Sequence, residues 1–96
     1  MATRTQNRYG KIVVANRAIR SVANSTLRET YGVASGRVSD VLVDENKIYL
    51  NLRIHLKYGV TPEAVCDMVR NQVKFNVENF SGMSVAVINI KVIGIK

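Results

Sequence analysis

Residues 48–65, IYLNLRIHLKYGVTPEAV, contain an alternating pattern that stops at a glycine, and a helix start follows. Apolar side chains occupy every second position over residues 48–56, which predicts a strand with one buried face and one wet face. Gly59 can take a positive φ at low steric cost, the Thr61 hydroxyl suits a helix N-cap, and Pro62 suits the first helical position. We therefore predict an architectural strand-to-helix corner. It comprises Tyr58, Gly59, Val60, Thr61 and Pro62.

The segments on either side of this corner have the three- and four-residue apolar spacing of helices with one buried stripe. Upstream, Asn16 suits an N-cap, and we expect a helix that runs to about Tyr31 and stops at Gly32. Downstream, we expect a helix over residues 62–80 with Gly82 just past its end. Its buried stripe is predicted to comprise Val65, Val69, Val73, Val77 and Phe80.

Three further segments have the composition of strands. They are the short run Lys11–Val14, residues 38–43 and residues 85–95. Residues 44–46 have turn composition, so the two middle strands should form a hairpin. The order strand-helix-strand-strand-helix-strand predicts an α+β fold. We expect a two-layer sandwich with both helices on one face of a small, mainly antiparallel sheet.

A chain of 96 residues with 47% hydrophobic content and one proline suits a single compact domain. We predict that residues 9–96 form this domain behind a flexible basic segment over residues 1–8. The apolar run over residues 12–15 is too short for a signal-peptide core of about 7–15 residues, and no stretch approaches the ~20 apolar residues of a membrane span. Cys66 is the only cysteine, which excludes an intramolecular disulfide and a cysteine-rich metal site. These features predict a cytoplasmic protein without a cofactor.

The formal net charge is +7, and it is concentrated near the N-terminus. Six basic residues precede Glu29, the first acidic residue. Arg17, Arg20 and Arg28 should lie opposite the apolar stripe of the first helix. This line is a candidate face for an acidic partner, either nucleic acid or anionic lipid headgroups. The alternative is a solvated helix face without a partner.

No pattern of residues indicates catalysis. His55 and Cys66 are the one pair that suggests a nucleophile and a base, but they are expected on opposite sides of the sheet. The carboxylates form no acid and base pair on one element, and the spacings of zinc, calcium and phosphate-loop motifs are missing from the sequence. We therefore predict that the protein is not an enzyme.

Some apolar residues exceed what one core needs. Met68 and Phe75 lie seven residues apart and off the main stripe of the second helix, and Val85 and Val87 are expected on the sheet face away from the helices. These four residues are candidate protein contacts and predict a homo-oligomer. The wet face of the strand over residues 48–56 lacks the several aromatic residues of RNA-recognition sheets, so we interpret it as an oligomer contact or a solvent face.

Several short motifs resemble the alkaline shock protein family, the cell-envelope stress response proteins of mainly Gram-positive bacteria. These motifs are Gly10-Lys11-Ile12, Tyr31-Gly32-Val33, Lys57-Tyr58-Gly59-Val60, Gln72-Val73, Val77, Ser81-Gly82, and Val87-Ile88-Asn89-Ile90-Lys91-Val92 with Gly94. The resemblance implies a cytoplasmic, non-enzymatic protein that self-associates near the inner face of the membrane, often recruited by a membrane-anchored partner. It supplies no catalytic residues. Many members are acidic whereas this chain is basic, which leaves the acidic partner open.

Overall fold

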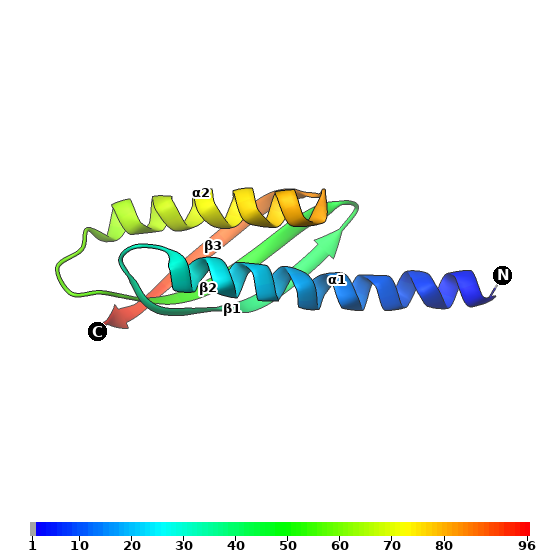
Figure 1. Cartoon of the computed structure of the whole chain (residues 1–96), viewed down its shortest axis with the longest axis horizontal. Helices are drawn as coiled ribbons and strands as arrows, with labels where there is room; N and C mark the ends of the chain where they lie inside the picture. The colour runs from blue at the N-terminus through cyan, green and yellow to red at the C-terminus, as the bar shows by residue number, and fades with distance from the viewer. Residues whose placement is uncertain (1) are drawn as a thin grey trace.

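The structure is a computed structural model that describes the backbone of residues 2–96 and the side chains of residues 16–96. Within these residues two helices and three strands follow one another. They are α1 (Ala2–Glu29), β1 (Val33–Asp44), β2 (Lys47–Leu56), α2 (Pro62–Ser81) and β3 (Ser84–Ile95). The strands form one sheet in the order β1-β2-β3, and both helices cover the same face of it (Figure 1). The predicted α+β class and two-layer arrangement are confirmed.

The strand expected over Lys11–Val14 is instead part of α1. Short apolar runs fit either element, and a helix gains backbone hydrogen bonds within its own segment, whereas a strand needs a neighbouring strand. Asn16 consequently lies inside α1 and is not its N-cap. The side chains of residues 1–15 lie outside the described residues. The flexible segment over residues 1–8 and the domain boundary at residue 9 stay predictions.

The sheet is mixed rather than mainly antiparallel, because its two strand pairs run in opposite senses. β1 and β2 are antiparallel and are joined by Glu45 and Asn46, whose positive φ values of 48° and 65° are those of a tight hairpin turn. β2 and β3 are parallel, since α2 carries the chain back to the start of the sheet before β3 begins.

The core lies between the sheet and the helices, with β2 at its centre. All five apolar side chains of the alternating pattern over residues 48–56 are buried, as predicted. The helix residues that meet them are Ile19, Ala23, Leu27, Val65, Val69, Val73 and Val77. Phe80 does not join the stripe and is 57% exposed, because it falls in the last turn of α2, past the final buried valine.

An extra residue in β3 changes which face its first side chains take. Ile48 pairs with Val85 but Tyr49 pairs with Val87, so the register shifts by one residue between the two pairs. Because sides alternate along a strand, this shift places Val85 in the core, 8% exposed, and Val87 on the opposite face, 40% exposed. The expectation that both valines share the open face was wrong for Val85.

The corner between β2 and α2 ties three elements together. The N–H of Lys57 donates to the carbonyl of Gly32 (2.9 Å), and the N–H of Tyr58 donates to that of Lys96 (3.2 Å). Gly59 has φ of 89°. Thr61 precedes α2 in an extended conformation but makes no side-chain capping bond, contrary to expectation. Pro62 opens the helix as predicted, and Gly82 ends it with φ of 73° and an N–H bonded to the Glu78 carbonyl.

Candidate functional site: the open face of the sheet

The structure separates the two residues that suggested nucleophilic chemistry. His55 projects from β2 on the open face, where its Nδ1 lies 3.3 Å from Ser35 Oγ. Cys66 is half-buried on α2, which covers the opposite face. Among the residues whose side chains are described, no group of three or more His, Cys, Asp or Glu could hold a metal ion.

The predicted arginine line of α1 has a structural part. Arg17, Arg20 and Arg28 are all exposed, but Arg20 Nη1 donates to the Val38 carbonyl at 2.8 Å. Asn24 Oδ1 accepts from the Val38 N–H at 2.9 Å. The two helix side chains therefore satisfy both backbone groups of one residue on the edge strand β1.

We expect Arg20→Ala to lower the free energy of unfolding by about 1 kcal/mol, the usual loss for one hydrogen bond with partial solvent exposure. Arg17→Ala removes the same charge one turn earlier and should change stability by less than about 0.5 kcal/mol. Urea denaturation of both variants measures the difference. Equal stability of the two variants would mean that the bond to Val38 contributes nothing.

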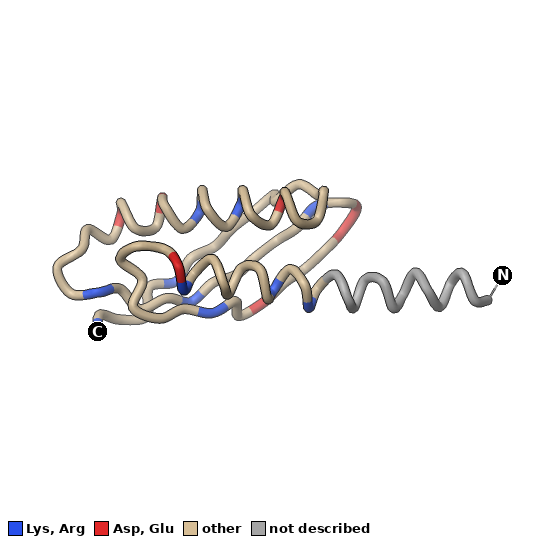
Figure 2. Tube along the Cα trace, viewed as in Figure 1, with Lys and Arg blue, Asp and Glu red and all other residues tan. Residues whose placement is uncertain are grey.

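The strand register arranges the open face into transverse rows, each with one residue from every strand. The rows are Leu42, Tyr49 and Val87; Asp40, Asn51 and Asn89; Arg37, Arg53 and Lys91; and Ser35, His55 and Gly94. Basic residues thus occur on all three strands (Figure 2). We call the first set the apolar row and the third the cation row.

The cation row places three positive charges side by side without a carboxylate partner. Neighbouring strands lie about 4.8 Å apart, and like charges directly opposite each other destabilise a sheet. The ion pair found within 4.0 Å among the described side chains joins Asp67 and Arg70 on α2, away from this face. The row therefore adds repulsion to the folded state and leaves its charges available.

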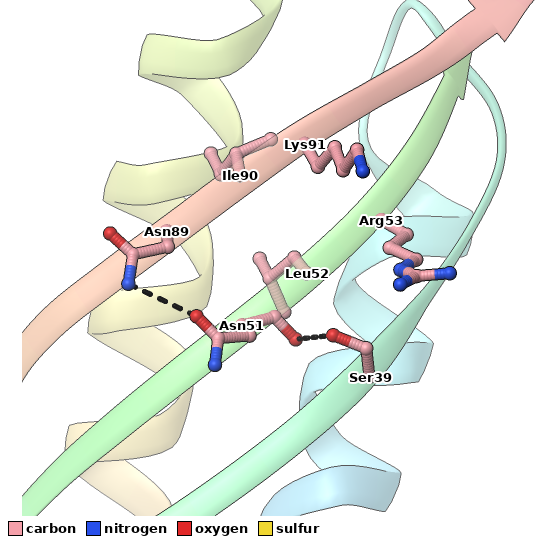
Figure 3. Close-up of a pocket in the computed structure, with 7 residues that line it drawn as sticks. All are labelled: Ser39, Asn51, Leu52, Arg53, Asn89, Ile90 and Lys91. Carbon is pink, nitrogen blue, oxygen red and sulfur yellow. Dashed lines mark hydrogen bonds between the residues drawn. The ribbon is translucent and has the colours of Figure 1, made fainter.

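A shallow hollow beside the cation row is lined mainly by polar groups (Figure 3). Asn89 Nδ2 donates to Asn51 Oδ1 at 3.0 Å, and Ser39 Oγ donates to the Asn51 carbonyl at 3.0 Å. Neither bond uses the charged groups of Arg53 or Lys91, which lie along the same wall. Arg53 also lines two further hollows, one with His55 and one with Arg20. Its guanidinium is the common element of this face.

The model of the alkaline shock protein family, described by a cell envelope-related function, matches residues 36–96. This range contains β2, α2, β3 and most of β1. The chain belongs to the alkaline shock protein family. The resemblance deduced from its motifs is confirmed.

A curated relative in this family is the uncharacterized protein YloU of Bacillus subtilis (strain 168). It is 24% identical over an alignment of 116 positions, which covers all of this chain and 97% of the relative. No solved structure gives a significant match. Neither described helix of this alkaline shock family protein is long and apolar enough to cross a membrane.

The apolar candidates are distributed over α2 and β3. Phe75 is 66% exposed, whereas Met68, seven residues earlier, is half-buried. Ile93 and Ile95 are exposed on β3, an edge strand with one neighbour. These positions supply apolar surface on the helix side and at one edge of the family fold, apart from the cation row.

The cation row was missed by sequence reasoning. The alternation over residues 48–56 indicates that Arg53 is on the wet face, but it does not identify its neighbours. Arg37 and Lys91 align with Arg53 only after register shifts in both strand pairs, at Val38/Asp40 and at Ile48/Tyr49. A register of this kind has no signal in the periodicity of a single strand.

Proposed function

We propose that this protein is a non-catalytic, self-associating structural protein of the cell envelope, working near the inner face of the membrane. The family supplies the envelope-related role. One observation supports self-association above all. The chain has two phenylalanines, and both are more than half exposed on α2, although phenylalanine is among the residues most often buried.

The apolar surface of α2 and β3 is better suited to self-association than the open sheet face. A two-fold contact centred on the cation row would bring like charges together. Around Phe75 the charges are mixed, with Lys74 beside it and Glu78 three residues on. Burial of one phenylalanine contributes about 1.5–3 kcal/mol, so a few such side chains can stabilise a dimer or a larger assembly.

The proposal places the protein in the cytoplasm, with a membrane-anchored protein as a further partner, as the family resemblance implies. The nucleic-acid alternative through Arg17, Arg20 and Arg28 has less support, because Arg20 is engaged with Val38. Its remaining support is the positive charge of the N-terminal part of the chain.

We expect the wild-type protein to form species larger than its 10.7 kDa chain in sedimentation velocity. Phe75→Glu should weaken this association by about 10–100-fold, because a phenylalanine contact is lost and a charge must be desolvated. The far-ultraviolet circular dichroism spectrum should not change, since Phe75 contributes little to the core.

Lys74→Glu is the matched control, because it adds negative charge at the neighbouring exposed position and leaves the ring in place. This control should keep the large species. A wild-type chain that stays monomeric across the accessible concentration range refutes self-association. If Phe75→Glu assembles like the wild type, the α2 surface is not the contact.

A further inference from the structure

We propose that the open face of the sheet binds an anionic phospholipid surface. In this arrangement Arg37, Arg53 and Lys91 contact lipid phosphates, while the apolar row enters the headgroup region. This inference goes beyond the proposed function, which requires neither direct lipid contact nor this face. It rests on the chemistry of two rows that the strand register builds side by side.

The first argument is charge complementarity. The three cations of the row span two inter-strand spacings, which is about 10 Å, so one face can reach several neighbouring phosphates. Each Lys or Arg close to an anionic membrane contributes about 1 kcal/mol of attraction. Phosphates placed between the cations would also relieve the repulsion that the isolated fold carries. Lys96 adds a nearby positive charge, with its Nζ 3.1 Å from Ser35 Oγ.

The second argument is the position of the apolar row on the same face. Leu42 is 57% exposed and Val87 is 40% exposed, and the ring of Tyr49 lies between them. Tyrosine is favoured at membrane interfaces because it combines an apolar ring with a polar hydroxyl. Four residues of β2 separate the two rows, about 13 Å. A flat lipid surface can therefore contact both rows at once, and apolar burial then adds to the electrostatic attraction.

Other acidic surfaces match this face less well. Sheets that bind single-stranded nucleic acid stack bases on several aromatic rings, and Tyr49 is the one aromatic ring other than His55 among the four rows. Asp40, which lies between the apolar and cation rows, is the one carboxylate in the four rows. It reduces the attraction but leaves the cations in excess. The combination of few aromatic rings, exposed aliphatic side chains and clustered cations favours lipid.

The test is co-sedimentation of the full chain with two kinds of vesicle, one of phosphatidylcholine alone and one of phosphatidylcholine mixed with phosphatidylglycerol. We expect binding to the mixed vesicles, a fall in binding as salt rises, and little binding to the neutral vesicles. The variant Arg37→Gln/Arg53→Gln/Lys91→Gln should bind the mixed vesicles about 10–100-fold more weakly. It removes repulsion within the sheet, so its circular dichroism and thermal transition should show an intact fold.

A matched control, Arg17→Gln/Arg28→Gln/Lys74→Gln, removes the same charge from the helices. It should bind the mixed vesicles more tightly than the row variant by about tenfold, because screening limits the effect of distant charges. If the two triple variants bind equally, general charge accounts for binding and the site is refuted. Equal binding of the wild type to neutral and mixed vesicles also refutes it.

Two further arms separate lipid from the other partners. Leu42→Ser/Val87→Ser should weaken binding to mixed vesicles by about tenfold while leaving its salt dependence unchanged, since the apolar contribution is not screened. A labelled oligonucleotide that binds through the cation row when the vesicles do not would overturn the lipid assignment. Phe75→Glu should retain row-dependent binding, so failure of self-association and failure of lipid binding are distinguishable.

Discussion

We expect Gly32→Ala to lower the free energy of unfolding by about 2–4 kcal/mol. Gly32 has φ of 90°, a conformation that costs a residue with a Cβ about 1–2 kcal/mol. A Cβ at this position would also lie 2.6 Å from Val65 Cγ2. Because valine is stiff at χ1, relief of this clash requires movement of α2 or of the β1 start, at about 1–3 kcal/mol. Urea denaturation monitored by circular dichroism gives the change.

Gly59→Ala is the matched control for this prediction. Gly59 has nearly the same φ, 89°, but an added Cβ would meet no atom within 4 Å. Gly59→Ala should therefore lose only the backbone contribution, about 1–2 kcal/mol. In a double-mutant cycle, Val65→Ala should recover part of the Gly32→Ala loss. Equal losses at both glycines would contradict the close approach of Gly32 to Val65.

We expect Leu50→Ala to lower the free energy of unfolding by about 2–5 kcal/mol. Leu50 is buried in the middle of β2, between the sheet and the helices. Truncation removes apolar burial and leaves a cavity that β2, paired with a strand on each side, has little freedom to fill. The shift of the urea midpoint at constant m-value measures the loss.

Leu42→Ala provides the comparison, since Leu42 lies on the neighbouring strand and faces solvent. Its loss should stay within about 0.5 kcal/mol, as is usual for exposed positions. The contrast between two leucines one residue pair apart tests which face of the sheet is covered. Similar losses at both positions would mean that the helices do not define the buried face.

The elements with a complete local pattern were predictable from the sequence. The alternation over residues 48–56 specifies a strand with one buried face, because successive side chains of a strand point to opposite sides. Gly59 and Pro62 indicate where the corner begins and ends, and Gly82 ends α2 in the left-handed conformation predicted for a helix C-terminus. In each case the physical preference acts within a few residues of the chain.

The failures occurred where a preference depends on a distant neighbour. Lys11–Val14 has strand composition but lies in α1, since its side-chain types fit both elements. Val85 has the same spacing from Val87 as other side chains on one strand face, yet an extra residue in β3 separates their faces. The missing Thr61 cap shows the same limit, because the Thr61 hydroxyl suits a cap by residue type alone.

The candidate site divides along the same line. The sequence determined by itself that the protein is basic, that Arg53 lies on the wet side of its strand and that no catalytic motif is present. Only the tertiary structure decided that Arg37, Arg53 and Lys91 form one row, that Arg20 bonds to Val38, and that both phenylalanines are exposed. Local periodicity sets the face of a side chain within its own element, whereas register shifts and helix placement set its neighbours, and these depend on contacts between segments far apart in the chain.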